Sequence, residues 1–227
     1  MVGRIRAPDP DARTRCRRAP TRRRPRGTRD TLSMMFRSLR AGVVALAIAL
    51  VVVGCGGSTA PSFDPTGVCR ADGRAAGAYP DLEAFVPAVY QGVPPKTLDS
   101  GRNCSTVNLG SLATRGITEV RFAGGTWTFG AERAAVLAVF RAAGLDAESL
   151  ATFYGDGARA NGRTEILGQS KPTIAGRPGW RLDTKTGARA QTVVVWPAGD
   201  LDAVNVVITN DLPDARIADA IDAFGGR

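Results

Sequence analysis

The sequence predicts an α+β fold, in which an antiparallel sheet of about five to seven strands carries a C-terminal helix and one or two further helices. Three observations support this prediction. Apolar segments in the last third of the chain are separated by turn residues at the spacing of hairpins. The chain closes on a segment with helical periodicity. The composition, 44% hydrophobic and 22% charged, is typical of a folded globular protein.

The first elements of the domain are expected to be short. Asp81 is suited to cap a helix over residues 82–86, which Pro87 ends. Residues 93–98 include two Pro and are therefore expected to form at most an edge strand. Residues 108–114 are long enough for one helical turn.

The middle of the chain carries mixed signals. Residues 117–129 contain regularly placed apolar and aromatic side chains and predict a strand, with a bulge at Gly124 and Gly125. Residues 135–141 fit both the helical and the strand period. Their short length and the helix start that follows favour a strand, with a helix as the alternative.

A well-specified helix begins near residue 146. Asp146 is suited as its N-cap, and Leu145 and Leu150 occupy the two positions of a hydrophobic staple. Gly155 and Gly157 are expected to end or fray this helix, because Gly is a weak helix former.

The last third of the chain predicts four strands, over residues 163–168, 179–183, 191–196 and 203–209. The third of these lacks polar–apolar alternation, which indicates a strand covered on both faces. A final helix begins near Pro213 and stops at Gly225. Its apolar residues follow i, i+3, i+4, i+7 spacing: Ile217, Ala220, Ile221 and Phe224.

The formal net charge of +9 over 227 residues invites the hypothesis of nucleic-acid binding. The charge is unevenly placed, however, because the first 54 residues hold 13 Arg and three Asp, and the rest of the chain is close to neutral. Residues 1–33 predict a disordered Arg-rich extension, or a stretch that is never translated if Met34 or Met35 starts the protein. No aromatic residues are interleaved with its Arg residues for base stacking, so we expect no nucleic-acid partner.

Residues 34–54 predict an export signal. Arg37 and Arg40 give it a positive start, and residues 41–53 form an uncharged apolar run that is too short for a comfortable transmembrane span. The residues at its end and just after it are Val52, Val53, Gly54 and Cys55.

These four residues resemble the lipobox of bacterial lipoproteins. The resemblance implies cleavage before Cys55, a thioether-linked diacylglycerol on its sulfur with a further acyl chain such as palmitate, and anchoring at the extracytoplasmic face of the cell membrane. The alternatives are a plain secretory signal or a short signal anchor. Residues 55–78 are expected to form a flexible tether, followed by a single domain over residues 79–227.

Two further cysteines, Cys69 and Cys104, are predicted to form a disulfide, because pairing is the default for an exported chain. Two free thiols are the alternative. Cys16 lies in the Arg-rich extension and is assigned no role.

The element order of the C-terminal half resembles a known fold. A strand precedes Gly176-Arg177-Pro178-Gly179-Trp180, and a strand, a hairpin, another strand and the closing helix follow. This order resembles the PsbP-like fold, also found in LpqN-type actinobacterial lipoproteins, over about residues 118–225. The resemblance implies a curved sheet crossed by the final helix, acting as a binding or assembly module without a shared catalytic residue.

The sequence offers little for catalysis. The absence of His excludes Ser-His-Asp and Cys-His catalysis and the common zinc sites, and no phosphate-binding glycine motif is present. Asp200 with Asp202, or Asp211 with Asp214, are candidates to ligate a hard cation, but neither pair has the 12-residue calcium-loop pattern, and they are expected to serve turns and caps. We therefore predict no catalytic residue, no metal site and no cofactor.

Three tryptophans, Trp127, Trp180 and Trp196, are candidates for lining an apolar ligand pocket, with the core of the sheet as the alternative. The leading functional hypothesis is a non-catalytic binding or envelope-assembly module, whose partner is an envelope protein or a small apolar ligand in a crevice between sheet and helix. The alternatives are a carboxylate-dependent hydrolase of envelope glycans and a passive structural lipoprotein.

Overall fold

A computed structural model of the chain describes residues 63–130, 132–199 and 203–225. The Arg-rich extension, the export signal and the lipobox, including Cys55, lie outside these ranges. Within them, no helix has the length and the apolar character needed to cross a membrane.

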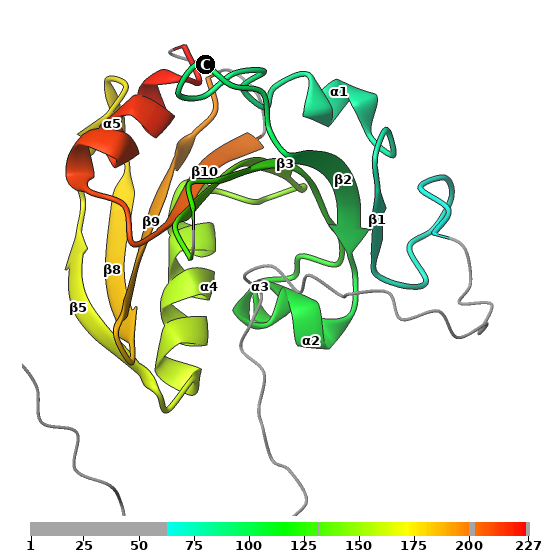
Figure 1. Ribbon diagram of the computed structural model, residues 1–227. Helices are drawn as coiled ribbons and strands as arrows, with labels where there is room; N and C mark the ends of the chain where they lie inside the picture. The colour runs from blue at the N-terminus through cyan, green and yellow to red at the C-terminus, as the bar shows by residue number, and fades with distance from the viewer. Residues whose placement is uncertain (1–62, 131, 200–202, 226–227) are drawn as a thin grey trace, which may run out of the picture. The chain divides into compact units, whose positions relative to one another are not determined.

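The centre of the fold is an open antiparallel sheet of eight strands in the order β1-β2-β3-β4-β10-β9-β8-β5. The strands are β1 (Gly73–Ala75), β2 (Thr97–Asn103), β3 (Val120–Thr128), β4 (Ala134–Arg141), β5 (Thr164–Ser170), β8 (Trp180–Thr186), β9 (Arg189–Pro197) and β10 (Ala203–Asn210). A separate small hairpin contains β6 (Thr173–Ile174) and β7 (Arg177–Pro178). The sheet bends strongly along its width (Figure 1).

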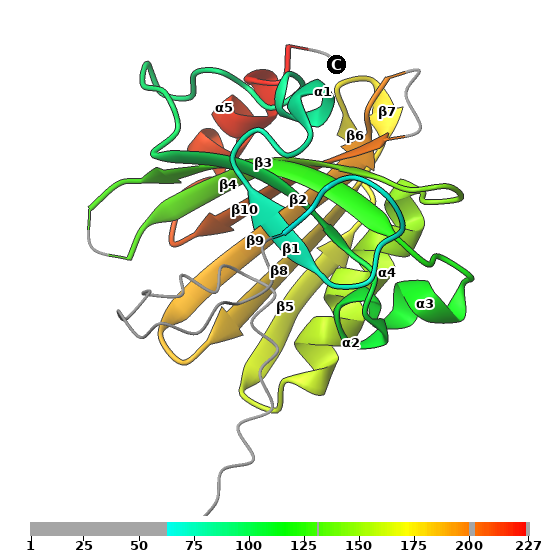
Figure 2. The ribbon, with the colours of Figure 1, turned by 90° about the vertical axis from the view of Figure 1, so that its right-hand side faces the viewer.

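Helices cover both faces of the sheet. The described helices are α1 (Pro80–Glu83), α2 (Thr106–Leu109), α3 (Ser111–Thr114), α4 (Ala147–Ala160) and α5 (Asp214–Asp222). Figures 1 and 2 show α2, α3 and α4 within the bend of the sheet, and α1 and α5 on its outer side. The predicted α+β class with a C-terminal helix is confirmed, with one strand and two helices more than the expected upper numbers.

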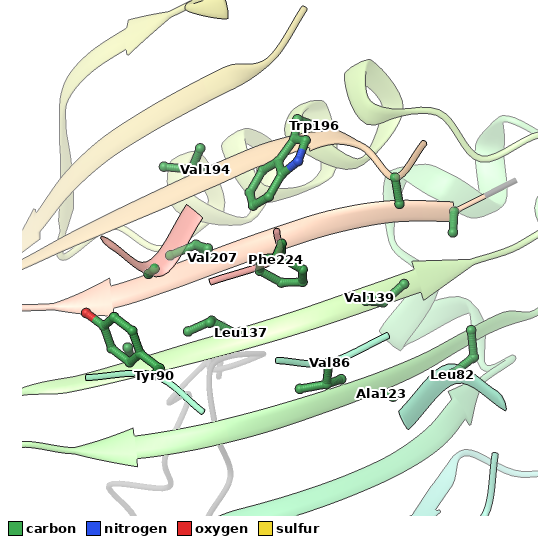
Figure 3. Close-up of a cluster of buried hydrophobic side chains, with 14 of the residues drawn as sticks. Leu82, Val86, Tyr90, Ala123, Leu137, Val139, Val194, Trp196, Val207 and Phe224 are labelled. Atoms are coloured by element: carbon green, nitrogen blue, oxygen red, sulfur yellow. The ribbon is translucent and has the colours of Figure 1, made fainter. Parts of the chain in front are cut away.

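Successive side chains of the central strands belong to two different apolar clusters, one on each face of the sheet. On β10, Val204 and Val206 belong to the inner cluster beneath α4, whereas Val207 belongs to the outer cluster beneath α5. Both faces of β9 are also buried, which confirms the prediction made from its unbroken apolar run. In the outer cluster, the rings of Trp196 and Phe224 pack edge to face with centroids 5.2 Å apart (Figure 3).

The N-terminal part of the described chain is tied to the sheet. β1 pairs with β2, and Phe63 packs against the outer cluster. Arg102, whose side chain is buried, donates hydrogen bonds to the carbonyls of Asp64 and Gly67 at 3.0 and 2.8 Å. The predicted tether over residues 55–78 therefore extends too far, because its polar and Gly residues serve turns that are held by the domain.

The disulfide between Cys69 and Cys104 is confirmed, with the two Cα atoms 6.1 Å apart. Asp72 reinforces the same junction, since its carboxylate accepts the backbone N–H groups of Cys104 and Ser105 at 2.6 and 2.8 Å. Burial opposes ionisation of Asp72, but hydrogen bonds from Ser105, Cys104 and Asn108 outweigh it and lower its pKa.

The predicted edge strand over residues 93–98 is wrong in extent and position. β2 starts only at Thr97, after both prolines, and lies between β1 and β3. The predicted cap of the first helix is wrong as well: Asp81 lies inside the first turn, and Tyr79 occupies the N-cap position.

The predicted bulge at Gly124 and Gly125 is also wrong, because β3 keeps its register with both neighbours through this pair. The requirement at Gly125 is steric. A Cβ there would lie 2.8 Å from the ring of Trp127, which is buried beside it. The ambiguous segment that follows is β4, so the preference for a strand is confirmed.

Helix α4 starts where the sequence predicts but ends later. Asp146 is its N-cap, with a carboxylate oxygen accepting the backbone N–H of Ser149 at 2.6 Å. The helix then continues through Gly155 and Gly157 to Ala160. Packing of its apolar face on the sheet outweighs the weak helix propensity of the two glycines.

Candidate ligand-binding pocket

A pocket of about 250 Å³ lies between α4 and the end of the sheet formed by β5, β8 and β9. The apolar face of α4 fixes this position, since Leu150 is buried and packs in the same cluster as Val193 and Val195 of β9. The volume is below the range of roughly 300–1,000 Å³ typical of pockets for drug-sized ligands. The pocket therefore suits a small molecule.

The apolar lining comes from the two layers on either side of the pocket. Trp180 and Leu182 on β8 and Val193 and Val195 on β9 contribute from the sheet, and Tyr154 contributes from α4. The valines point inward because alternate residues of β9 face α4, whereas Val194 and Trp196 belong to the outer cluster.

Tyr154 places a hydroxyl group in this apolar setting. Among the described residues, no hydrogen-bond partner of this hydroxyl is found, and the ring packs edge to face on Phe153 with centroids 5.5 Å apart. Burial raises the pKa of Tyr154, so the phenol stays protonated at physiological pH. Tyr154 therefore offers a neutral hydrogen-bond donor to the pocket.

Charged residues lie around the rim. Lys171 places its ammonium group 5.7 Å from the centroid of the Trp180 ring and 3.7 Å from a carboxylate oxygen of Glu148. Arg181 is held by Asp183 at 2.8 Å and by Asp214 at 2.7 Å, and hydrogen bonds to these carboxylates raise the pKa of its guanidinium against the effect of burial. The guanidinium of Arg181 therefore lies on the α5 side of the sheet, and the charged pair at the rim beside α4 is Lys171 with Glu148.

A second polar group lies over the middle of α4, where Gln169 of β5 and Arg159 of α4 reach Gly155. A Cβ on Gly155 would lie 3.1 Å from the Gln169 side-chain nitrogen and 3.5 Å from a guanidinium nitrogen of Arg159. A Cβ at this position would require the ends of these flexible side chains to move by a few tenths of an ångström. Gly155 therefore lets both side chains approach the helix closely, at a cost in helix propensity of about 1 kcal/mol relative to Ala.

Only one of the three candidate tryptophans, Trp180, lines this pocket. Trp127 and Trp196 are buried in the outer cluster, on the opposite face of the sheet. The Trp127 indole N–H donates to the carbonyl of Val93 at 3.0 Å, whereas the Trp196 indole nitrogen has no hydrogen-bond partner among the described residues. The structure therefore does not bring the three tryptophans together.

The acidic residues considered for metal binding are separate or serve other contacts. Asp211 accepts the backbone N–H of Ala190 at 2.8 Å, and Asp214 pairs with Arg181. Asp200 and Asp202 lie outside the described residues. In the described part of the chain, no group of three or more Cys, His, Asp or Glu side chains is arranged to hold a metal ion.

Sequence reasoning did not single out most of the residues that line the pocket. Tyr154 has the helical spacing of a buried residue, four positions after Leu150, and Arg159, Gln169 and Lys171 belong to no motif. One signal was present: a Gly inside an otherwise well-specified helix can mark a close approach by another group. Gly155 is that residue.

The chain matches no protein-family model and no curated protein sequence.

Proposed function

We propose that the protein is a membrane-anchored extracytoplasmic lipoprotein, whose folded domain binds a small amphiphilic ligand in the pocket between α4 and the sheet. The observation that carries this proposal is the pocket itself. An aromatic and aliphatic lining with a few polar groups on its rim is the usual composition of small-molecule sites.

The lining favours binding over glycan hydrolysis. Glycosidases need two carboxyl groups facing the scissile bond, about 5–10 Å apart. Glu148 is the one acidic residue among those that line the pocket, and it pairs with Lys171. A purely structural role does not require the opening beside Trp180.

The described domain begins close to the proposed anchor. Phe63 lies eight positions after Cys55, and a fully extended chain over this stretch spans at most about 28 Å. Lipidation of Cys55 would therefore hold the domain, and its pocket, near the membrane surface. The Cys69–Cys104 disulfide is consistent with an oxidising compartment outside the cytoplasm.

Titration with 1-octanol tests the binding function. We expect the full chain, carrying Cys55→Ala so that no lipid is attached, to show a saturable shift of the Trp180 indole signal in ¹H–¹⁵N spectra. Trp180→Ala should weaken binding at least tenfold, as followed by the remaining pocket amides. Val107→Ala, at an exposed position on α2, is the matched control and should leave binding unchanged. The absence of a saturable shift at the pocket would contradict the proposal.

The anchor is tested by two matched substitutions, Cys55→Ala and Cys16→Ala. Cys55→Ala should release the protein from the membrane fraction and remove the mass of the attached lipid. Cys16→Ala should leave both unchanged. A Cys55→Ala variant that still carries lipid would refute the lipoprotein assignment.

A further inference from the structure

The group formed by Arg159 and Gln169 over Gly155 indicates which end of a ligand the pocket receives. Both side chains approach one point, the missing Cβ of Gly155, at 3.1 Å for the Gln169 nitrogen and 3.5 and 3.6 Å for the two terminal nitrogens of Arg159. They therefore lie within about 7 Å of each other, a separation that one carboxylate can bridge with two hydrogen bonds.

The guanidinium of Arg159 and the side-chain amide of Gln169 both donate hydrogen bonds, and no described residue accepts from both. One terminal nitrogen of Arg159 donates to Asp156 at 2.8 Å, and the other has no hydrogen-bond partner among the described residues. The side-chain amide of Gln169 likewise has no hydrogen-bond partner in the described part of the chain. An arginine terminal nitrogen only donates hydrogen bonds, and the amide presents its NH₂ to the same point, so the complementary ligand group is an acceptor.

Charge near this point favours an anion among the possible acceptors. Arg159 and Lys171 are the two cationic side chains on the α4 side of the pocket, where Glu148 is the acidic lining residue and pairs with Lys171. Arg181 also lines the pocket, but its guanidinium is bonded to Asp183 and Asp214 on the α5 side of the sheet. Asp156 accepts a hydrogen bond from one terminal nitrogen of Arg159. The other terminal nitrogen is left to donate a charge-assisted hydrogen bond, which a carboxylate accepts more strongly than a hydroxyl and which an ammonium group cannot accept.

The apolar part of the site lies along the helix from this polar group. Trp180 is near the start of α4, since Lys171 contacts both its ring and Glu148. Gly155 lies seven positions after Glu148, or about 10 Å along the helix axis. An extended aliphatic chain of about eight to nine carbons has a similar length, given C–C bonds of about 1.5 Å at tetrahedral angles.

We propose that the pocket selects a short carboxylate amphiphile, whose head is held by Arg159 and Gln169 over Gly155 and whose apolar part contacts Trp180. This inference rests on the proposed binding function and narrows it to one ligand class. The resulting complex places an anionic group beside α4 and an apolar chain against β8 and β9.

Three probes of equal chain length separate the two proposals: octanoate, 1-octanol and octylammonium. They are titrated into the full chain carrying Cys55→Ala, and the Trp180 indole and pocket amides are followed by ¹H–¹⁵N spectra. Octanoate should bind at least tenfold more tightly than 1-octanol, and octylammonium should bind most weakly. If octanoate and 1-octanol bind equally, or octylammonium binds best, the carboxylate assignment fails and the binding function stands. If none of the three binds, both fail.

Substitutions locate the head group. Arg159→Gln and Gln169→Ala should each weaken octanoate at least fivefold and change the affinity for 1-octanol less than twofold. Gly155→Ala should weaken octanoate while leaving the melting temperature unchanged or higher, because the added Cβ displaces the Gln169 amide and Ala favours the helix. Gly157→Ala is the matched control, since it makes the same change two residues further along the same helix, away from the position that Arg159 and Gln169 approach. Equal effects of Gly155→Ala and Gly157→Ala on octanoate, or unchanged affinity in Arg159→Gln, would overturn the placement of the head.

Discussion

Removal of the Cys69–Cys104 disulfide should destabilise the domain mainly through the unfolded chain. The two cysteines are 35 residues apart, and the chain-entropy relation for a closed loop of this size gives about 4 kcal/mol at 25 °C. The native fold should persist in the double variant Cys69→Ala, Cys104→Ala, because Asp72 and Arg102 hold the same junction through hydrogen bonds.

Urea unfolding followed by tryptophan fluorescence measures this effect. The double variant should lose about 4 kcal/mol of unfolding free energy, and its m-value should rise, because an uncrosslinked unfolded chain exposes more surface. Cys16→Ala, which leaves both Cys69 and Cys104 in place, is the control. A loss below about 1 kcal/mol with an unchanged m-value would refute the argument that the bond acts on the unfolded state.

Other predictions concern the core and the helix. Leu137→Ala, at a position with 0% exposure in the central sheet, should cost about 2–5 kcal/mol in unfolding free energy. Leu98→Ala, at a position that is 36% exposed, should cost much less. Similar losses in the two variants would contradict the assigned core. Asp146→Ala should cost about 1 kcal/mol by removing the N-cap of α4. The hydrogen bond from the Ser149 backbone lowers the pKa of Asp146. Its stabilisation is therefore present above the unfolded-state pKa and is lost as the pH falls through the lower folded-state value, so wild type and Asp146→Ala should converge in acid. Gly155→Ala should gain up to about 1 kcal/mol in thermal unfolding, and a large loss would show that the Gln169 side chain cannot move aside.

The sequence was most informative where local and tertiary preferences agree. Asp146 caps α4, and the unbroken apolar run of β9 forms a central strand that is buried on both faces. β1 is only three residues long and pairs through Gly73, so no periodic signal could reveal it. The continuation of α4 through Gly155 depends on packing against the sheet, which propensity alone does not contain.

The sequence predicts a pocket between helix and sheet, but it does not predict most of the residues that line it. A crevice between helix and sheet follows from the fold class, and Trp180 was among its candidates. Gln169 and Arg159 meet because β5 pairs with β8 beside the end of α4. Such a meeting of side chains ten residues apart across a turn has no sequence motif.

The place of β10 in the sheet has a consequence for how the chain folds during synthesis. β10 lies between β4 and β9, and its Asn210 pairs with Ala134, 76 positions earlier. The first four strands and the β5, β8 and β9 group are thus two separate half-sheets until the last strand arrives. Long-range pairing of this kind slows folding and leaves apolar strand faces exposed meanwhile. The domain must therefore be protected from aggregation until almost its whole length has emerged.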